Sequence, residues 1–571
     1  MRRTLPADLI GATLVWCLDL DWGGATYRIA SEPIDVKGVD GLTMSYTGGL
    51  EVPRVREVLG RLRFDAPELS ATVRAVLPVD VVTVRRRGYD WLGASGALYL
   101  TTCRTADRGL TVPTSDLSHD EMWLQVAGRP RSPRYAIPGA PPGLVEFTLQ
   151  IAPWDEGKVP LIAGDLTINA ERFDGGGALG IGPPPEDTDG KRIPIVLGTP
   201  GRYQEDDAII QAQGSPMYAA ERNAAGEALA LVACTGHVES MTIDVFDGAG
   251  VSASQITLRD FDALGAPVSY YLPSGIDATS TEFFASWGKD GATPSPFSTG
   301  VLIRAPEVAA YLLAQSGLDV DLPAWLALDG FLPRLEVSGY INDGASAWDV
   351  LASHVLPLMP VAYRYTRQGL APVVYDPELL TGLEVAHVRT VDTPDAEGSG
   401  DWTPTSGLDL ETEPEDVVSV LTVNYAKNGS TGDFLRQVVW VGDSIGAPLP
   451  RSGQRRRRGD RSGSLYVDQA TTRGATATEV LELEMVWDRP TAEAVAAWRT
   501  RLACMSTESA SYSAPLHWGW LRVGDVVLID DVGKRFTDQP ALIESREIGP
   551  AGIDFVLVFT EDPVRDPRAI D

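Results

Sequence analysis

Residues 13–34 read TLVWCLDLDW, then Gly23-Gly24, then ATYRIASEPI. Next to the glycine pair, apolar and polar side chains alternate in LDLDW at 18–22 and in TYRI at 26–29, as they do in half-buried strands. Glycine accepts the positive φ angles of a two-residue hairpin turn. The segment therefore predicts a β-hairpin near the start of the chain. Short alternating runs separated by Gly and Pro continue through the first 155 residues, at 81–85, 97–102, 122–126 and 144–151.

The composition favours a β-rich chain with real cores. The 57 Gly and 41 Pro make up about 17% of the 571 residues, against an average near 12%, which favours short strands and turns. Hydrophobic residues account for 44%, including 14 Trp. The 48 basic and 78 acidic residues give a net charge of −30, which argues against a protein that wraps nucleic acid by neutralising its phosphates.

The length predicts about four domains at roughly 150 residues each. We expect a mainly β chain, α+β overall, with one small α/β module. Residues 1–155 and 156–300 have the pattern of two β domains, and the character changes near residue 301. A helix–hairpin α/β module is predicted at 301–380, and a C-terminal β domain with one helix at 381–571.

Apolar side chains at helical spacing predict three helices, at 306–315, 345–356 and 491–505. In the second of these, Trp348, Leu351 and Val355 form the stripe that we expect to be buried. A pair of strands joined through a turn at Gly369 is expected to follow.

The cysteines and the first residues bear on the compartment. The four cysteines are far apart, which favours reduced, buried thiols over a disulfide framework. The apolar stretch near the start is interrupted at its beginning by Asp8 and lacks a small-residue cleavage site, so a cleaved signal peptide is not predicted. No apolar run approaches the ~18 residues of a membrane-spanning helix. We expect synthesis in the cytoplasm and no stable membrane insertion.

The sequence predicts no cofactor, no metal site and no catalytic residues. Residues 175–180, GGGALG, match a dinucleotide-binding pattern, but Pro183-Pro184-Pro185 cannot begin the helix that such a site needs. The five histidines lack any zinc-binding spacing. Glu482 and Glu484 alternate along one stretch, so they could act as the acid and base of a glycosidase, although an exposed, charged strand face is commoner.

Four consecutive arginines, Arg455, Arg456, Arg457 and Arg458, stand out against the acidic background. They lie in 450–464, a Gly- and Ser-containing stretch that predicts an exposed loop. Such a loop can hold DNA phosphate or an acidic neighbouring subunit, or it can be a solvated hairpin tip. The four arginines are therefore a candidate partner-contact loop, with these alternatives open.

Several motifs, taken in order, resemble tail hub (baseplate hub) proteins of long-tailed bacteriophages and of the related gene transfer agents. They are DGKRIPIVLG at 189–198, SAWDVL at 346–351 followed by LPLMP at 356–360 and a hairpin through Gly369, LTVNY at 421–425, and the helix 491–505 leading into VGDVV at 523–527. The resemblance extends over about residues 190–560, and residues 1–150 match no family that we can name.

The resemblance implies a structural ring subunit, usually a homotrimer, with two tube-like β-barrels per chain. The C-terminal domain at 381–571, with its one helix, is accordingly expected to be a β-barrel domain. Such a ring continues the tail tube and passes genomic DNA without specific binding. It contacts distal tail or tail tube proteins, the tape measure protein, and tail-tip, fibre or spike proteins. The expected location is the tail tip of a virion made in the bacterial host cytoplasm, and the expected role is not enzymatic.

Two other functions stay open. A receptor- or carbohydrate-binding tail-tip protein is favoured if several of the 14 Trp lie exposed in one patch. A cell-wall-degrading enzyme is favoured only if two carboxylates face one another in a cleft.

Overall fold

The computed structural model describes residues 12–560 in two compact units. Unit 1 comprises residues 1–155, 362–412 and 506–571, and unit 2 comprises 156–361 and 413–505. Both are therefore assembled from separate stretches of chain. The sequence predicts four domains that follow one another along the chain. The two units group the chain in another way and do not test that division, so it stays a prediction. The description omits 39, 60–67, 92, 105–112, 151–166, 169–184, 206–207, 224, 236–242, 248–251, 254–256, 264–265, 273–278, 281, 288–292, 294, 317, 343–344, 376–382, 396–397, 411–417, 442–476 and 505–506.

Unit 1 is built on a 16-stranded sheet, with one short pair, β24 (Pro394–Asp395) and β25 (Gly398–Ser399), and another, β21 (Val361–Thr366) and β22 (Gly369–Val374), beside it. The sheet strands are β1 (Ala12–Trp22), β2 (Ala25–Ala30), β3 (Ile34–Lys37), β4 (Thr43–Gly48), β5 (Arg54–Val58), β6 (Glu68–Val76), β7 (Ser95–Arg104), β8 (Trp123–Tyr135), β9 (Leu144–Gln150), β23 (Glu384–Arg389), β26 (Thr403–Pro404), β27 (Asp409–Leu410), β31 (Thr507–Ala514), β32 (Val526–Asp531), β33 (Phe536–Gly549) and β34 (Gly552–Thr560).

The predicted hairpin at the start of the chain is confirmed. β1 pairs antiparallel with β2, and the turn residues Gly23 and Gly24 have φ angles of 64° and 79°. Alternate residues of β1, such as Trp16 and Leu18, point into a large apolar core shared by both ends of the chain. The local pattern was sufficient here because the partner strand follows within two residues.

One predicted strand in this unit is wrong. Residues 81–85 lie in helix α1 (Val81–Arg86). The side chain of Asp80 caps this helix, accepting hydrogen bonds from the Val82 amide at 3.0 Å and the Thr83 hydroxyl at 2.7 Å. The alternation over five residues was too short to outweigh this cap.

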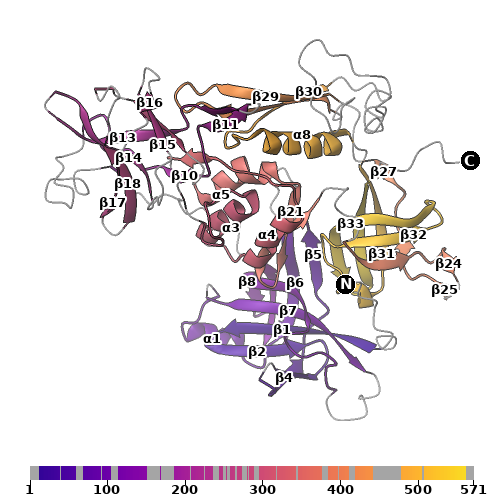
Figure 1. Ribbon diagram of the computed structural model, residues 1–571. Coiled ribbons are helices and arrows are strands. Elements are labelled where there is room, and N and C mark those ends of the chain that lie inside the picture. Colours follow the sequence, from indigo (N-terminus) through magenta and orange to yellow (C-terminus); the bar gives the residue numbers. More distant parts are fainter. Residues whose placement is uncertain are drawn as a thin grey trace, which may run out of the picture. The chain divides into compact units, whose positions relative to one another are not determined.

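The N-terminal and C-terminal strands form one sheet because β33 pairs antiparallel with β5, bringing Arg546 opposite Glu57. Figure 1 shows the C-terminal strands in yellow and the N-terminal strands in indigo. The mainly β class is confirmed. The described strands leave the sheet open, with β26 at one end and β3 at the other, so they form no closed barrel. Closure would require these edge strands to pair.

Unit 2 combines a seven-stranded antiparallel sheet with smaller elements. The sheet order is β16-β15-β19-β13-β14-β18-β17. These strands are β13 (Ser215–Arg222), β14 (Ala228–Thr235), β15 (Ile243–Asp247), β16 (Ser252–Ala253), β17 (Thr257–Ala263), β18 (Ala266–Leu272) and β19 (Phe283–Trp287). Two short pairs accompany the sheet: β10 (Ile195–Leu197) with β20 (Gly339–Ile341), and β11 (Arg202–Glu205) with β12 (Ala208–Gln211).

A helical layer and a three-stranded sheet complete unit 2. Helix α3 (Ala305–Gln315) packs against α4 (Leu322–Ala327) and α5 (Ala347–Val350). Helix α8 (Arg489–Cys504) covers one face of β28 (Val418–Lys427) and β29 (Phe434–Val441), as Figure 1 shows. β30 (Ala477–Glu482) pairs parallel with β28. The predicted helices at 306–315 and 491–505 are confirmed to within two residues at each end.

The predicted helix at 345–356 is a composite. α5 is followed by a π-helical turn, Leu351–Val355, and a 3₁₀ turn, Leu356–Leu358. Pro357 has no amide proton to bond the carbonyl four residues earlier, so a regular α-helix cannot continue through it. The expected stripe is confirmed, because Trp348, Leu351 and Val355 are all buried.

Among the described residues, the helices are too short or too polar to cross a membrane.

Candidate functional site

A buried cluster of charges lies in unit 1, where β5 and β33 meet. Glu57 is 2% exposed and Arg546 is fully buried, and the Arg546 Nε lies 2.5 Å from the carboxylate. Arg522, just before β32, donates to the same carboxylate at 2.6 Å. Arg546 also donates to the Leu521 carbonyl at 2.7 Å and to the Gln125 side chain at 2.9 Å. Every strong donor and acceptor of this group thus has a partner inside the unit.

The charges determine the protonation state of this cluster. Burial alone would raise the pKa of Glu57, but the guanidinium groups of Arg522 and Arg546 outweigh it and lower the pKa to about 2. Burial lowers the pKa of Arg546 to about 10, so it remains a cation at neutral pH. The cluster, which we call the Glu57 network, joins chain segments up to 489 positions apart. Its partners are all internal, so its role is to hold the fold together.

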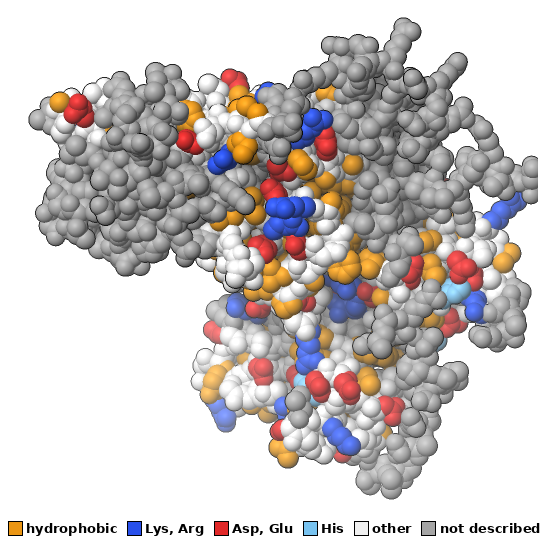
Figure 2. Space-filling model, viewed as in Figure 1, with side chains coloured by type: hydrophobic (Ala, Val, Ile, Leu, Met, Phe, Trp, Pro, Cys, Tyr) orange, Lys and Arg blue, Asp and Glu red, His pale blue; other side chains and the backbone are white. Residues whose placement is uncertain are grey.

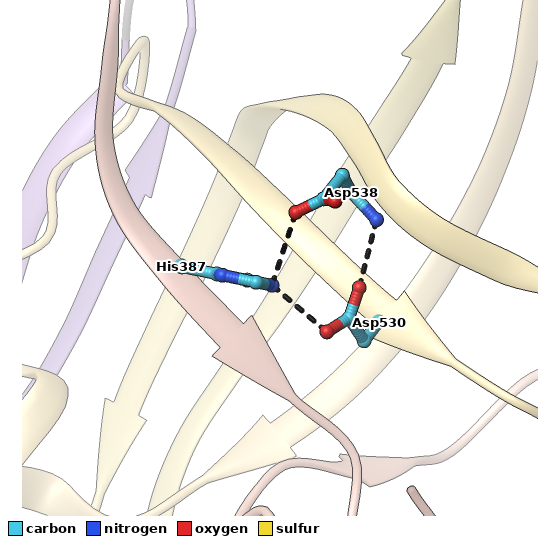
Figure 3. A group of neighbouring side chains, drawn as sticks. All are labelled: His387, Asp530 and Asp538. Carbon is cyan, nitrogen blue, oxygen red and sulfur yellow. Dashed lines mark hydrogen bonds and ion pairs between the residues drawn. The ribbon is translucent and has the colours of Figure 1, made fainter. Parts of the chain in front are cut away.

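Three potential metal ligands meet at the end of β23 and the β32–β33 hairpin (Figure 3). The His387 Nε2 lies 2.9 Å from an Asp530 oxygen and 3.6 Å from an Asp538 oxygen. The Asp538 amide donates to Asp530 at 2.7 Å. Histidine and carboxylates are suitable ligands for zinc. A hydrogen bond between His387 and Asp530 accounts for this geometry without an ion, and the expectation of no metal site stays a prediction.

A polar cavity of about 590 Å³ lies within unit 2. Its lining includes Asp349 of α5, Ser353 and His354 of the π-helical turn that follows α5, and the turn between β28 and β29. Lys427, at the end of β28, and Glu484, after β30, form an ion pair of 2.6 Å in its lining. The remaining lining residues are Gly214, Gly339, Tyr340, Ile341, Asn342, Ala345, Val350, Asn428, Gly429, Ser430, Thr431, Gly432, Met485 and Trp487.

The turn beside the cavity is shaped by its own sequence. The Asn428 side chain accepts hydrogen bonds from the amides of Ser430 and Thr431, at 2.8 and 3.2 Å. Gly432 has a φ of 77°, a conformation that favours glycine. The string NGSTG at 428–432 signals this turn in the sequence. Nothing in the sequence indicates that this turn lines the same cavity as α5.

The candidate residues from the sequence have different outcomes. Arg455–Arg458 and the glycines of 175–180 lie outside the described residues. Glu482 is exposed on β30, whereas Glu484 lies beyond the strand and is paired with Lys427. The two carboxylates therefore occupy different settings, and only Glu484 lines the cavity. Sequence reasoning missed both this cavity and the Glu57 network.

Residues 461–538 match the family model described as "Putative phage tail protein". Over this segment the chain is therefore similar to phage tail proteins. The matched stretch includes β30, α8, β31 and β32. The resemblance to phage tail proteins inferred from the sequence is thus confirmed over this segment. Among curated protein sequences, none matches this chain significantly.

Solved structures show distant similarity to this chain. A chain of the virion of a native gene transfer agent particle is 15% identical, with a TM-score of 0.40, covering 66% of this chain and 85% of that one. The prophage MuSo2 43 kDa tail protein from Shewanella oneidensis is 8% identical, with a TM-score of 0.33, covering 96% and 98%. A chain of the phage P2 baseplate in its activated conformation with Ca is 13% identical, with a TM-score of 0.18, covering 54% and 80%. These values carry no information on individual residues.

Proposed function

We propose that this chain is a structural tail hub subunit. Three copies form a ring that continues the tail tube, passes genomic DNA and anchors the tail tip. Its neighbours are distal tail or tail tube proteins, the tape measure protein, and tip, fibre or spike proteins. It is made in the bacterial host cytoplasm and resides at the tail tip of the virion. The observation that carries this proposal is the match of residues 461–538 to phage tail proteins.

The construction of unit 1 supports a structural role. Its sheet joins strands from both ends of the chain, and the Glu57 network binds these strands from within. A buried carboxylate with two guanidinium partners is costly to separate, because an unpaired charge would remain inside the fold. Such an arrangement resists separation of the two ends of the chain, which suits a part that transmits force between its neighbours.

The charge supports passage of DNA without retention. Each chain carries −30, so three chains carry a formal charge of about −90. If the inner wall of the proposed ring is acidic, it repels the phosphates of DNA, whereas each phosphate neutralised by Lys or Arg would add affinity for DNA. On the face drawn in Figure 2, the described basic side chains are interspersed with acidic ones. We place Arg455–Arg458 outside the channel, at a subunit contact or in solvent.

The first test is the oligomeric state. We expect light scattering on the purified full-length chain to give about 184 kDa, three times 61.3 kDa, and negative-stain images to show rings. A 61.3 kDa species at every concentration, together with tails in which this chain forms no ring, would contradict the hub role.

The second test is DNA binding. We expect no tight, salt-sensitive binding of duplex DNA in fluorescence polarisation, because an acidic conduit gains nothing from counterion release. The matched comparison replaces Arg455–Arg458 with serine. Tight binding by the natural chain that falls steeply with salt and is lost in the serine variant would show that the arginines hold DNA, which contradicts their proposed position.

The alternatives receive less support. The side chains of twelve Trp are described, and of these none is exposed: ten are buried, and Trp123 and Trp520 are half-buried. A stacking platform of several exposed Trp is therefore not present among these twelve. We also propose that the chain is not an enzyme, since Glu482 and Glu484 occupy different settings.

A further inference from the structure

The polar cavity of unit 2 has the dimensions of a ligand site. Its volume of about 590 Å³ lies within the range of roughly 300–1,000 Å³ that small-molecule sites occupy. Its walls come from β20, the α5 segment, the β28–β29 turn and the residues after β30. All four belong to the same unit. The π-helical turn at Leu351–Val355 carries Ser353 and His354 in one wall, and such turns occur often at functional sites.

Close backbone contacts fix two sides of this cavity. A Cβ at Gly339 would lie 2.5 Å from the Met485 side chain, and the Ser338 amide donates to the Met485 carbonyl at 2.7 Å. A Cβ at Gly429 would lie 2.6 Å from the Gly214 carbonyl oxygen. Strand β20 and the β28–β29 turn are thus fixed in position before a ligand binds. Preformed walls reduce the ordering cost of binding.

The Lys427–Glu484 pair provides a donor and an acceptor side by side. The ammonium and the carboxylate are 2.6 Å apart, and the side chains are 34% and 41% exposed, so a ligand can reach both. An ammonium only donates hydrogen bonds and a carboxylate only accepts them. Two neighbouring hydroxyl groups of a sugar match this pair, since one can accept from Lys427 while the other donates to Glu484.

The rest of the lining selects against other ligands. The carboxylates of Glu484 and Asp349 repel an anion, and Lys427 repels a cation. Asp349 accepts hydrogen bonds from the amide and hydroxyl of Ser346, at 3.2 and 2.7 Å, which hold its carboxylate in place. Polar side chains of the lining, such as Ser353 and Thr431, disfavour a wholly apolar ligand.

We propose that this cavity binds one or two units of a neutral saccharide, with adjacent hydroxyls on Lys427 and Glu484. Tyr340, which is half-buried, contributes aromatic carbon to the lining, against which sugar C–H groups pack. This inference goes beyond the hub role, because it adds recognition of a carbohydrate to a structural subunit.

The experiment titrates the full-length chain with neutral disaccharides: chitobiose, maltose and cellobiose. N-acetylneuraminic acid and glucosamine serve as charged comparisons. We expect at least one neutral probe to bind, and Glu484→Gln to weaken that binding about tenfold or more, because hydrogen bonds to charged groups are the strong ones. The matched control is Glu493→Gln. Glu493 also pairs with a cation at 2.6 Å, from Arg489 on α8, but it does not line the cavity.

A second variant, Ser353→Trp, keeps the ion pair but fills the cavity from an exposed position of its wall. It should abolish binding while leaving the melting temperature unchanged. The proposal is overturned if no neutral probe binds at about 10 mM, if only a charged probe binds, or if both variants bind like the Glu493→Gln control. The mass of the assembly, measured on the same samples, reports separately on the hub role.

Discussion

Replacing Glu57 with Gln should destabilise unit 1 by about 3–5 kcal/mol, because it leaves buried cations without their counter-ion. Arg546 is fully buried, and its Nε donates to this carboxylate, as does Arg522. Hydrogen exchange of peptides from β5 and β33 would measure the effect locally. A local measurement is needed because a chain with two units need not unfold in one step.

The matched control is Glu68→Gln. Glu68 pairs with Arg56 at 3.4 Å, but the two side chains are 43% and 62% exposed. An exposed pair contributes about 0–1 kcal/mol, so this variant should exchange like the natural protein. Equal effects of the two substitutions would show that the Glu57 network does not stabilise unit 1.

The same variant tests a dependence on pH. The folded-state pKa of Glu57 is lowered to about 2 from an ordinary value of 4.5. In the unfolded chain this carboxyl takes up its proton near pH 4.5, whereas in the folded chain it stays ionised until about pH 2. Its contribution is therefore present above pH 4.5 and is lost as the pH falls from 4.5 to 2. In melting curves over this window, the natural protein should lose stability more steeply than Glu57→Gln.

Trp348→Ala should destabilise the helical layer of unit 2 by about 3–5 kcal/mol and reduce particle assembly. The Trp348 side chain is 8% exposed, in the helix α5 that packs against α3. Removing it leaves a cavity that the surrounding side chains only partly fill. Thermal melting and the yield of assembled particles would measure the effect.

The control for this prediction is Phe331→Ala, which removes an aromatic side chain that is 56% exposed in the same unit. We expect a change within about 0.5 kcal/mol, as for most surface positions. Unchanged melting and unchanged particle yield for Trp348→Ala would contradict the structural importance of this stripe.

Features with a local cause could be predicted from the sequence. Gly23-Gly24 predicted the β1–β2 hairpin because the turn and both strands are neighbours in the chain. The stripe of Trp348, Leu351 and Val355 predicted a buried helical face, since its period depends only on helix geometry. Alternation likewise predicted strands such as β7 and β9, and with them the mainly β class. Where a cap or a proline competed with the pattern, as at Asp80 and Pro357, the local prediction was wrong or incomplete.

Contacts between distant segments could not be predicted in this way. Nothing near Glu57 indicates that Arg546 lies opposite it, 489 positions further on. Nor does the string at 428–432 indicate that its turn lines the same cavity as α5. Alternation specifies which face of a strand is apolar, but many strands of this chain share that pattern. Which of them pair depends on the packing of whole sheets, and the buried charges and the cavity exist only after that packing is complete.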